Sequence, residues 1–240
     1  FHVDDCKISH LDSKVANYTI AWLRNEYESV FTDGRGMMKV AQGKVHKYLG
    51  ITLDFATSKT VKVTMLEYVD EIIESWDKAC SELDDGYKAV SGRKRIASAA
   101  PDDLFKVDED AVKLDQARAK AFHNITAKGI YVTKRARPDI SLSIVFLTTR
   151  VKGPDIDDWR KLCHLVEYLR STRGLPLILA ADGTGVLSWY VDALFAVHPD
   201  IRGHTGGTMT METGFPLDKS TKHIRQEFSF EICSLRVWPG

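Results

Sequence analysis

The spacing of apolar residues changes twice along this 240-residue chain, and this change constrains the fold more than any other feature. Apolar and polar residues alternate between residues 37 and 65, which predicts strands, whereas residues 115–173 repeat apolar residues at helical spacing. From Leu175 the period returns to two. Segregated runs of strands and helices are typical of an α+β fold. We therefore expect an α+β protein.

The first 80 residues are expected to form one unit. A strand, a turn at Asp4-Asp5 and a return strand open it, and Asp12 or Ser13 can cap the helix that follows. The turn-forming residues Thr57-Ser58-Lys59 separate two strand-like runs and predict a hairpin near residues 48–65. A second amphipathic helix is expected at residues 69–80.

Three further segments follow along the chain. Residues 81–114 show no periodicity and are expected to be a poorly ordered linker. Residues 115–174 are predicted to be helical, with a break at Arg137-Pro138 and a new helix capped by Asp155. Residues 175–240 contain two strand-like runs, near residues 187–195 and 204–213.

Composition restricts the classes of function. Lys plus Arg and Asp plus Glu number 33 each, so the formal net charge of zero argues against a strongly basic nucleic-acid coat or an acidic chaperone. A local basic groove remains compatible with this balance. The four cysteines lie far apart without a CxxC pair, which argues against a zinc finger and favours a reducing compartment. No apolar run approaches the ~18 residues of a membrane helix. We expect an intracellular protein, in the cytoplasm or nucleus, that is neither secreted nor membrane-bound.

Three places in the sequence could carry chemistry. Asp4 and Asp5 pair two carboxylates in a turn between strands, a donor set that Mg²⁺ accepts together with water and phosphate oxygens. Asp192 lies in an otherwise apolar strand, where a buried acid needs a partner such as a metal ion. The alternative for Asp4 and Asp5 is a solvated turn, and the alternative for Asp192 is the exposed face of its strand.

The third place is a basic stretch around an aromatic residue. Basic side chains interleaved with an aromatic ring can follow a phosphate backbone. A solvated helix end is the alternative interpretation. The candidate nucleic-acid-binding residues are Lys128, Lys134, Arg135 and Arg137.

Taken together, five segments resemble the C-terminal part of the reverse transcriptase of copia-type retrotransposons, running into the start of its RNase H domain. The resemblance covers about residues 1 to 222, and the combination and spacing of the segments carry it rather than any one of them. They are Phe-His-Val-Asp-Asp at residues 1–5, the Lys-Tyr-Leu-Gly-Ile run at 47–51, Arg-Pro-Asp-Ile at 137–140, Trp159 with the block at 169–174, and Val-Asp-Ala at 191–193 with His-Thr-Gly-Gly at 204–207.

The resemblance implies roles for these segments. Asp4 and Asp5 would be the paired metal carboxylates of the polymerase palm, and Asp192 would be the first acid of the RNase H site. The hairpin at residues 48–65 would guide the primer end, and the helices from 115 to 173 would form a thumb and connection that contact an RNA/DNA hybrid or template-primer duplex. Mg²⁺ and, in the parent enzyme, a deoxynucleoside triphosphate are the ligands implied, and two-metal phosphoryl transfer is the chemistry. The last segment would be a truncated RNase H-like domain.

Several departures from the family shape what we expect of this chain. A further metal-binding Asp would precede Phe1, and the sequence after Lys222 does not match the expected helix start with its catalytic Glu, so we expect a fragment whose catalytic set is incomplete and which alone is inactive. Gly129 stands where the family has a bulky apolar residue and would weaken its helix by ~1 kcal/mol relative to Ala. The alternatives are a non-catalytic nucleic-acid-binding remnant and a functionless product of a decayed transposable element.

Overall fold

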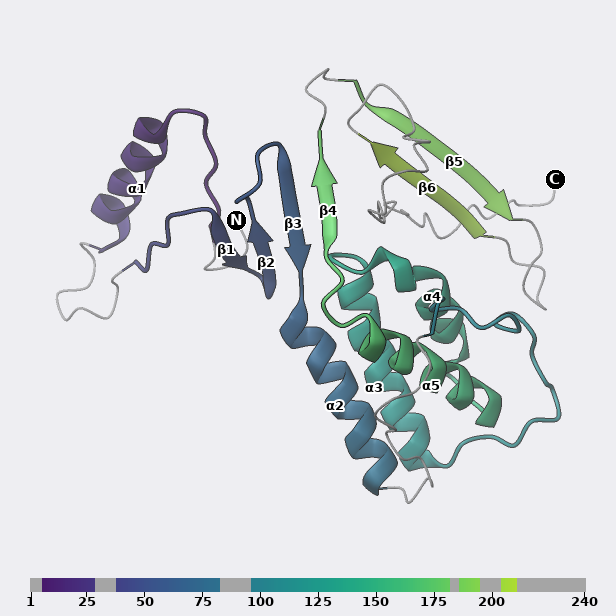
Figure 1. Ribbon diagram of the computed structural model, residues 1–240. Helices are drawn as coiled ribbons and strands as arrows, with labels where there is room; N and C mark the ends of the chain where they lie inside the picture. Colours follow the sequence, from purple (N-terminus) through teal and green to yellow (C-terminus); the bar gives the residue numbers. More distant parts are fainter. Residues whose placement is uncertain (1–5, 29–37, 83–95, 182–185, 195–203, 211–240) are drawn as a thin grey trace, which may run out of the picture.

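The computed structural model describes residues 6–28, 38–82, 96–181, 186–194 and 204–210, and five helices longer than one turn lie among them (Figure 1). It has α+β architecture, as the sequence predicts. Of the strands β5 (Ser188–Leu194) and β6 (His204–Thr210), little more than the backbone is described.

A four-stranded antiparallel sheet has the order β1-β2-β3-β4, formed by β1 (Val45–Tyr48), β2 (Ile51–Asp54), β3 (Thr60–Thr64) and β4 (Leu177–Ala180). The hairpin predicted around Thr57-Ser58-Lys59 is confirmed, because β2 pairs with β3 across this turn. A second turn, at Leu49 and Gly50, divides what the alternation predicts as one strand from 48 to 55.

One side of this sheet is apolar and the other is polar. The strand registers place His46 opposite Leu53, and Leu53 opposite Val63, on one side of the sheet. This is the apolar side, where Val63 and Leu177 are buried. The opposite side carries Lys47, Thr52 and Lys62. This alternation is what a sheet with one side packed and one side solvated requires.

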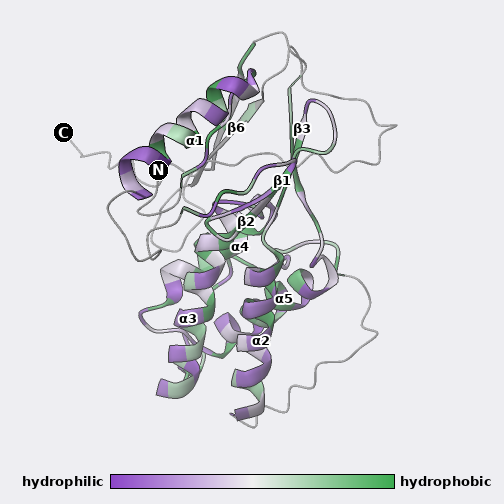
Figure 2. Cartoon of the chain, turned by 90° about the vertical axis from the view of Figure 1, so that its left-hand side faces the viewer, coloured by the Kyte–Doolittle hydropathy of each residue, from purple (hydrophilic) through white to green (hydrophobic). Residues whose placement is uncertain are grey.

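Helices α2 (Leu66–Glu82), α3 (Gln116–Thr133), α4 (Ser141–Arg150) and α5 (Ile156–Ser171) pack together at the end of the sheet where β3 leads into α2, with a single 3₁₀ turn at Pro138–Ile140 (Figure 1). Asp155 caps α5 as predicted, through a reciprocal capping box with Asp158. Figure 2 shows the outward parts of α2 and α3 as mostly hydrophilic.

A single core joins these helices to the sheet. Trp76 of α2 and Trp159 of α5 lie with ring centroids 4.6 Å apart, and Phe122, Phe146 and Leu162 are fully buried around them. Val63 and Leu177 belong to the same cluster. The first sheet, α2 and the later helices are therefore one packed unit, which differs from the expected boundaries at residues 80 and 174.

We call residues 96–114 the strap, because this segment crosses α4 and α5 without forming a helix or strand of its own. Ala99 and Leu104 are buried in the core, and Phe105 packs edge-on against Phe146 at 5.6 Å. The Ser143 hydroxyl donates to the Ala99 carbonyl at 2.9 Å. The expectation of a poorly ordered linker over 81–114 is therefore wrong for the strap, while residues 83–95 lie outside the described residues.

Helix α1 (Ser13–Tyr27) lies apart from the helices α2–α5 in Figures 1 and 2. Of the two cap candidates in the sequence, Asp12 and Ser13, it is Asp12 that caps the helix, by accepting from the Lys14 N–H at 2.8 Å. Only Leu23 is buried in this helix, and Tyr18 and Trp22 are exposed. Its apolar surface is thus largely uncovered by the described residues.

Candidate nucleic-acid interface

The proposed metal ligands fall mostly beyond what the structure describes. Asp4 and Asp5 lie outside the described residues, so their geometry stays a prediction. The backbone of Asp192 lies in β5, opposite Gly206 of β6, and these two antiparallel strands lie in the two runs that the sequence predicts as strands. The described residues contain no group of three or more His, Cys, Asp or Glu side chains that could hold a metal ion.

The four basic candidates do not form one surface, because Arg137 lies inside the protein. Its side chain is 2% exposed and its guanidinium donates to both oxygens of Asp139, with the shortest distance 2.8 Å. The same guanidinium donates to the carbonyl and the hydroxyl of Thr172 at 3.1 and 2.7 Å. The prediction that Arg137 contacts nucleic acid is thus corrected: this arginine joins the Pro138–Ile140 turn to the end of α5.

Tyr168 completes this internal network. Its hydroxyl donates to Asp139 at 2.9 Å, and burial together with the negative charge of Asp139 raises the pKa of Tyr168. A buried charge is stable only when it is paired and hydrogen-bonded. The Arg-Pro-Asp sequence supplies that pair locally, since Asp139 follows Arg137 by two residues, and this spacing was the available signal for burial.

Arg135, in contrast, has no carboxylate partner among the described residues. Its guanidinium carbon lies 3.6 Å from the centroid of the Tyr131 ring, and its Nη1 donates to the Tyr131 carbonyl at 3.2 Å. A guanidinium stacked on a ring keeps its remaining N–H groups at its edges. Arg135 is therefore held in a fixed orientation while its charge stays uncompensated.

All the other arginines of the described ranges have carboxylates within 4.0 Å. This contrast separates Arg135 from the arginines that serve the fold. The pairs are Arg24 with Glu28, Arg118 with Asp115, Arg137 with Asp139, Arg150 with Asp155 and Asp158, Arg160 with Asp103 and Asp157, Arg170 with Asp77, and Arg173 with Asp70.

The two candidate lysines flank Arg135 along the chain. Lys134 follows the last residue of α3 and is exposed. Lys128 donates to the Ser75 hydroxyl at 3.0 Å and lies 3.6 Å from the Glu71 carboxylate, so α2 already engages its charge. The structure thus leaves Lys134 and Arg135 as the candidates whose charges are available to an external anion.

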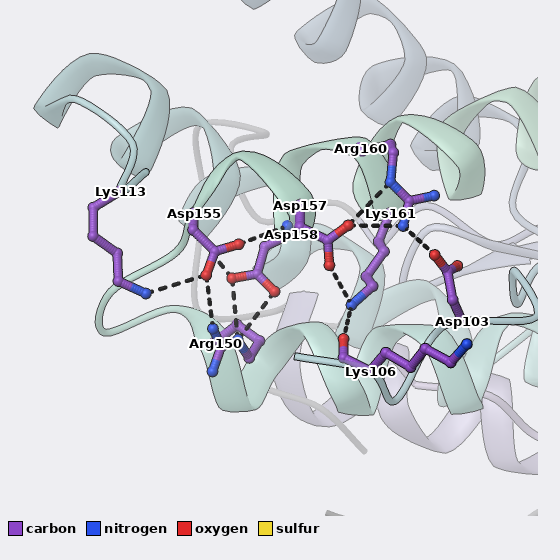
Figure 3. A network of polar contacts seen from close by, with 9 residues as sticks. All are labelled: Asp103, Lys106, Lys113, Arg150, Asp155, Asp157, Asp158, Arg160 and Lys161. Atoms are coloured by element: carbon purple, nitrogen blue, oxygen red, sulfur yellow. Dashed lines mark hydrogen bonds and ion pairs between the residues drawn. The ribbon is translucent and has the colours of Figure 1, made fainter. Parts of the chain in front are cut away.

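Acidic and basic side chains form a paired network at the start of α5 (Figure 3). Asp155 and Asp158 are each 1% exposed and share Arg150, whose Nη2 lies 2.9 Å from Asp155 and whose Nε lies 3.0 Å from Asp158. Lys113 of the strap adds a bond to Asp155 at 3.1 Å. This network fixes the strap to the beginning of α5.

Burial and charge act differently on the two acids. Burial opposes ionisation of Asp155, but the bond from the Asp158 N–H and the charges of Lys113 and Arg150 outweigh it and lower the pKa of Asp155. Burial raises the pKa of Asp158 despite its bonds to Arg150. The pKa values of the two neighbouring acids are thus shifted in opposite directions.

Lys161 is a buried lysine of α5 in the same region. Its ammonium lies 2.8 Å from Asp157, donates to the carbonyl of Lys106, and sits 4.9 Å above the Phe146 ring (Figure 3). Arg160 bonds to Asp103 at 2.6 Å. The contacts of Lys161 and Arg160 with Lys106 and Asp103 hold the strap on α5. This structural role accounts for the buried charge of Lys161 without a catalytic role.

Charge is distributed unevenly over the described chain. Residues 38–64, which include three strands of the sheet, hold five lysines against one aspartate, a formal charge of +4 with His46 neutral. Residues 96–115, which include the strap, hold two lysines against six acids, a formal charge of −4. Figure 1 shows the strap on the far side of the helices from β1–β3. A polyanion would therefore meet the sheet side of the molecule more favourably.

No helix in the described ranges combines the length and apolar character needed to cross a membrane.

The phenolic pair Tyr68 and Tyr131, which sequence analysis missed, lies at the sheet end of the helices with ring centroids 4.9 Å apart. Tyr131 belongs to the basic stretch that the sequence singles out. No feature of the sequence around Tyr68 indicates that Tyr68 packs against Tyr131.

Comparison with known proteins gives a distant relation. The chain is 22% identical over 183 residues to the Saccharomyces cerevisiae protein named "Putative transposon Ty5-1 protein YCL074W". The match covers 76% of this chain and 55% of that protein, so the chain spans about half the length of the curated relative it matches. No protein-family model and no solved structure matches the sequence. The similarity supports a relation to transposon proteins at this coarse level.

Proposed function

We propose that this chain is part of an RNA-directed DNA polymerase with RNase H from a copia-type retrotransposon, and that its described part binds an RNA/DNA hybrid or template-primer duplex. The observation that carries the binding proposal is Arg135, held flat on Tyr131 with its charge uncompensated by the described residues. The similarity to a yeast transposon protein supports the origin. The motifs at residues 1–5, 137–140 and 191–193 support the finer assignment.

Binding would proceed through phosphate contacts. Arg135 would offer the N–H groups at its edges to a phosphodiester oxygen, and the exposed ammonium of Lys134 would add a second, less directional contact. Such contacts fix position on the duplex without reading its sequence. Because each contact releases condensed counterions, affinity would fall steeply with salt.

Catalysis is proposed for the longer polymerase rather than derived from this geometry. Asp4, Asp5 and Asp192 would supply carboxylates to Mg²⁺, which would stabilise charge on the attacking and leaving oxygens. The described residues include none of these three side chains, so the arrangement of these carboxylates stays a prediction. Duplex binding is the part of the proposal that the described side chains support.

Binding of a labelled RNA/DNA hybrid at roughly 50 to 300 mM salt tests the proposal. The double variant Lys134→Gln/Arg135→Gln should reduce the slope of log affinity against log salt by about 2, since each phosphate contact contributes about 0.9. Lys152→Gln, which removes an exposed lysine after α4, is the matched control and should leave the slope unchanged.

Two results would overturn the proposal. One is hybrid binding whose salt slope is the same in the double variant and in the control. The other is a cooperatively folded chain that does not bind the hybrid at all, which would favour the functionless transposon product instead.

A further inference from the structure

Tyr131 makes three contacts that link two distant parts of the chain. One side of its ring lies under the Arg135 guanidinium at 3.6 Å, and the ring also packs against Tyr68 at 4.9 Å with an interplanar angle of 32°. Its hydroxyl donates to the carbonyl of Leu49 at 3.0 Å, across 82 residues of sequence. Tyr131 therefore touches both the candidate anion-binding arginine and the β1–β2 turn.

The β1–β2 turn is a strained and closely packed element. Leu49 and Gly50 have φ of 51° and 73°, as in the two-residue turns that join antiparallel strands with positive φ at both positions. A Cβ on Gly50 would lie 2.3 Å from Cε2 of Tyr68, so the tyrosine ring rests directly on the glycine. Tyr68 and Tyr131 together hold this turn on the helices.

We infer that Tyr131 is a positioning residue that couples a phosphodiester bound by Arg135 to the conformation of the β1–β2 turn. This inference rests on the proposed duplex-binding function and adds a route by which binding reaches the hairpin. The structure joins the two ends of the route, Arg135 and Leu49, through one aromatic side chain.

The physical basis is the shared orientation of the ring. The stacked ring limits the rotamers of Arg135, which lowers the entropy lost when the guanidinium binds a phosphate. The same ring cannot tilt without breaking the bond to Leu49, because its hydroxyl is fixed there. A phosphate that holds Arg135 in place therefore also stabilises the turn, and the coupling is reciprocal.

Three variants separate the contacts of Tyr131. Tyr131→Leu removes the stack and the hydroxyl, whereas Tyr131→Phe keeps the stack and removes only the bond to Leu49. Arg135→Gln removes the charge and leaves Tyr131 in place. Each is measured by the salt slope of RNA/DNA hybrid binding and by amide hydrogen exchange of residues 48–51, with and without the hybrid.

The expected pattern is specific to a positioning role. Arg135→Gln should lower the salt slope by about 1, whereas Tyr131→Leu should weaken hybrid binding at a fixed salt concentration and add no further loss when Arg135→Gln is already present. Tyr131→Phe should keep the slope but speed exchange at the turn. The hybrid should slow exchange at residues 48–51 in the unaltered chain and have no such effect in either Tyr131→Phe or Arg135→Gln.

The outcomes distinguish this inference from the function beneath it. A salt slope unchanged by Arg135→Gln overturns the proposed function of Arg135. A slope lowered by Arg135→Gln together with an affinity untouched by Tyr131→Leu leaves that function standing and overturns the positioning role. Loss of stability alone in Tyr131→Leu would lower the amplitude of binding without changing the affinity of the folded protein. The Tyr131→Phe exchange result decides the matter if the leucine variant fails to fold.

Discussion

At the scale of single residues, Arg137 buries a full positive charge between the Pro138–Ile140 turn and the end of α5. Asp139 and Thr172 accept all its short hydrogen bonds, and Tyr168 holds Asp139 from the other side. Removing one member of such a group leaves the other charge buried without a partner. The loss of stability on removing one partner is therefore larger than the stabilisation that the ion pair itself provides.

We expect Arg137→Met to lower the free energy of unfolding by about 3 kcal/mol, because the partly buried Asp139 would lose its positive partner and keep only the bond from the Tyr168 hydroxyl. Urea unfolding followed by circular dichroism measures this change. Lys152→Met, at an exposed position, is the control and should shift stability by less than about 0.5 kcal/mol. A loss below about 1 kcal/mol in Arg137→Met would mean that water reaches the pair.

Sequence reasoning about residues succeeded where the signal was local. The caps at Asp12 and Asp155 are predicted, since a short acceptor before an apolar helical stripe is recognisable from neighbours alone. For Arg137, the nearby Asp139 gave a local signal of pairing, whereas the Thr172 contacts come from 35 residues away. Partners that distant are not readable from composition or spacing.

At the scale of elements, Gly129 sets how closely α3 and α4 approach. A Cβ at Gly129 would lie 2.2 Å from Cδ1 of Ile144, the end of a buried but flexible side chain. The sequence-based expectation treated Gly129 as a loss of helix propensity. In the structure the glycine instead makes room for Ile144, so both effects act at this position.

We predict that Gly129→Ala lowers the free energy of unfolding by about 1 to 2 kcal/mol, since crowding exceeds the gain in helix propensity. Ile144→Val removes the crowded methyl and should cost about 0.5 to 1.5 kcal/mol alone. The double variant should be more stable than the sum of the single changes predicts. Strict additivity in urea unfolding would show that Ile144 moves aside freely.

The acid pair at the start of α5 makes that helix sensitive to pH. A lowered pKa in the folded state means that ionised Asp155 stabilises the fold above the ordinary pKa of about 3.9, and that this stability is lost as the pH falls through the folded value. The pKa of Asp70 is lowered as well, because Arg173 bonds to it. Burial opposes ionisation of Asp157, but the bond from Lys161 outweighs burial and lowers the pKa of Asp157. The raised pKa of Asp158 acts oppositely: its stabilisation is present at low pH and is lost as the pH rises through its folded value.

Stability should therefore change little between pH 7 and about 5 and fall below about pH 4. Asp155→Asn keeps the capping oxygen for the Asp158 N–H but cannot titrate. It should make the acid limb shallower by up to roughly 1.4 kcal/mol per pH unit. Urea midpoints from pH 7 to 2.5, with exposed Asp110→Asn as control, measure the difference. An acid limb of equal steepness in both variants would assign the effect to other carboxylates.

Among the elements, the helices were easier to predict than the strap and the first strands. The strap lacks any period because short turns alternate with bonds to other elements, for example the bond between His164 of α5 and the Ser98 carbonyl at 3.0 Å. The turn at Leu49 and Gly50 was hidden because the apolar pattern runs through it unbroken. Tertiary partners decided both cases.

At the scale of the whole molecule, burial divides the described chain into a strongly packed part and a loosely attached one. Helices α2–α5, the strap and the four-stranded sheet share one core, and Arg170 ties α5 to Asp77 of α2 at 2.6 Å. Helix α1 contributes only Leu23 as a buried residue. Opening of α1 should therefore cost much less than global unfolding.

Hydrogen exchange tests this division. Amides of α2, α3 and α5 should exchange only through global unfolding, with the bonded amides of the strap, such as Leu114, close behind. Amides of α1 should exchange faster by at least about tenfold, corresponding to about 1.4 kcal/mol. Slower exchange in α1 than in α5 would contradict the division.

Because the sheet and the strap carry formal charges of opposite sign, the described part of this formally neutral chain is polarised. Residues 38–64 carry +4 and residues 96–115 carry −4, on opposite sides of the helices. In the field of a charged rod or fibre the molecule would experience a torque before any contact, and would arrive with its lysine-rich end leading. A neutral protein could thus show encounter rates that depend on ionic strength as if it were a cation.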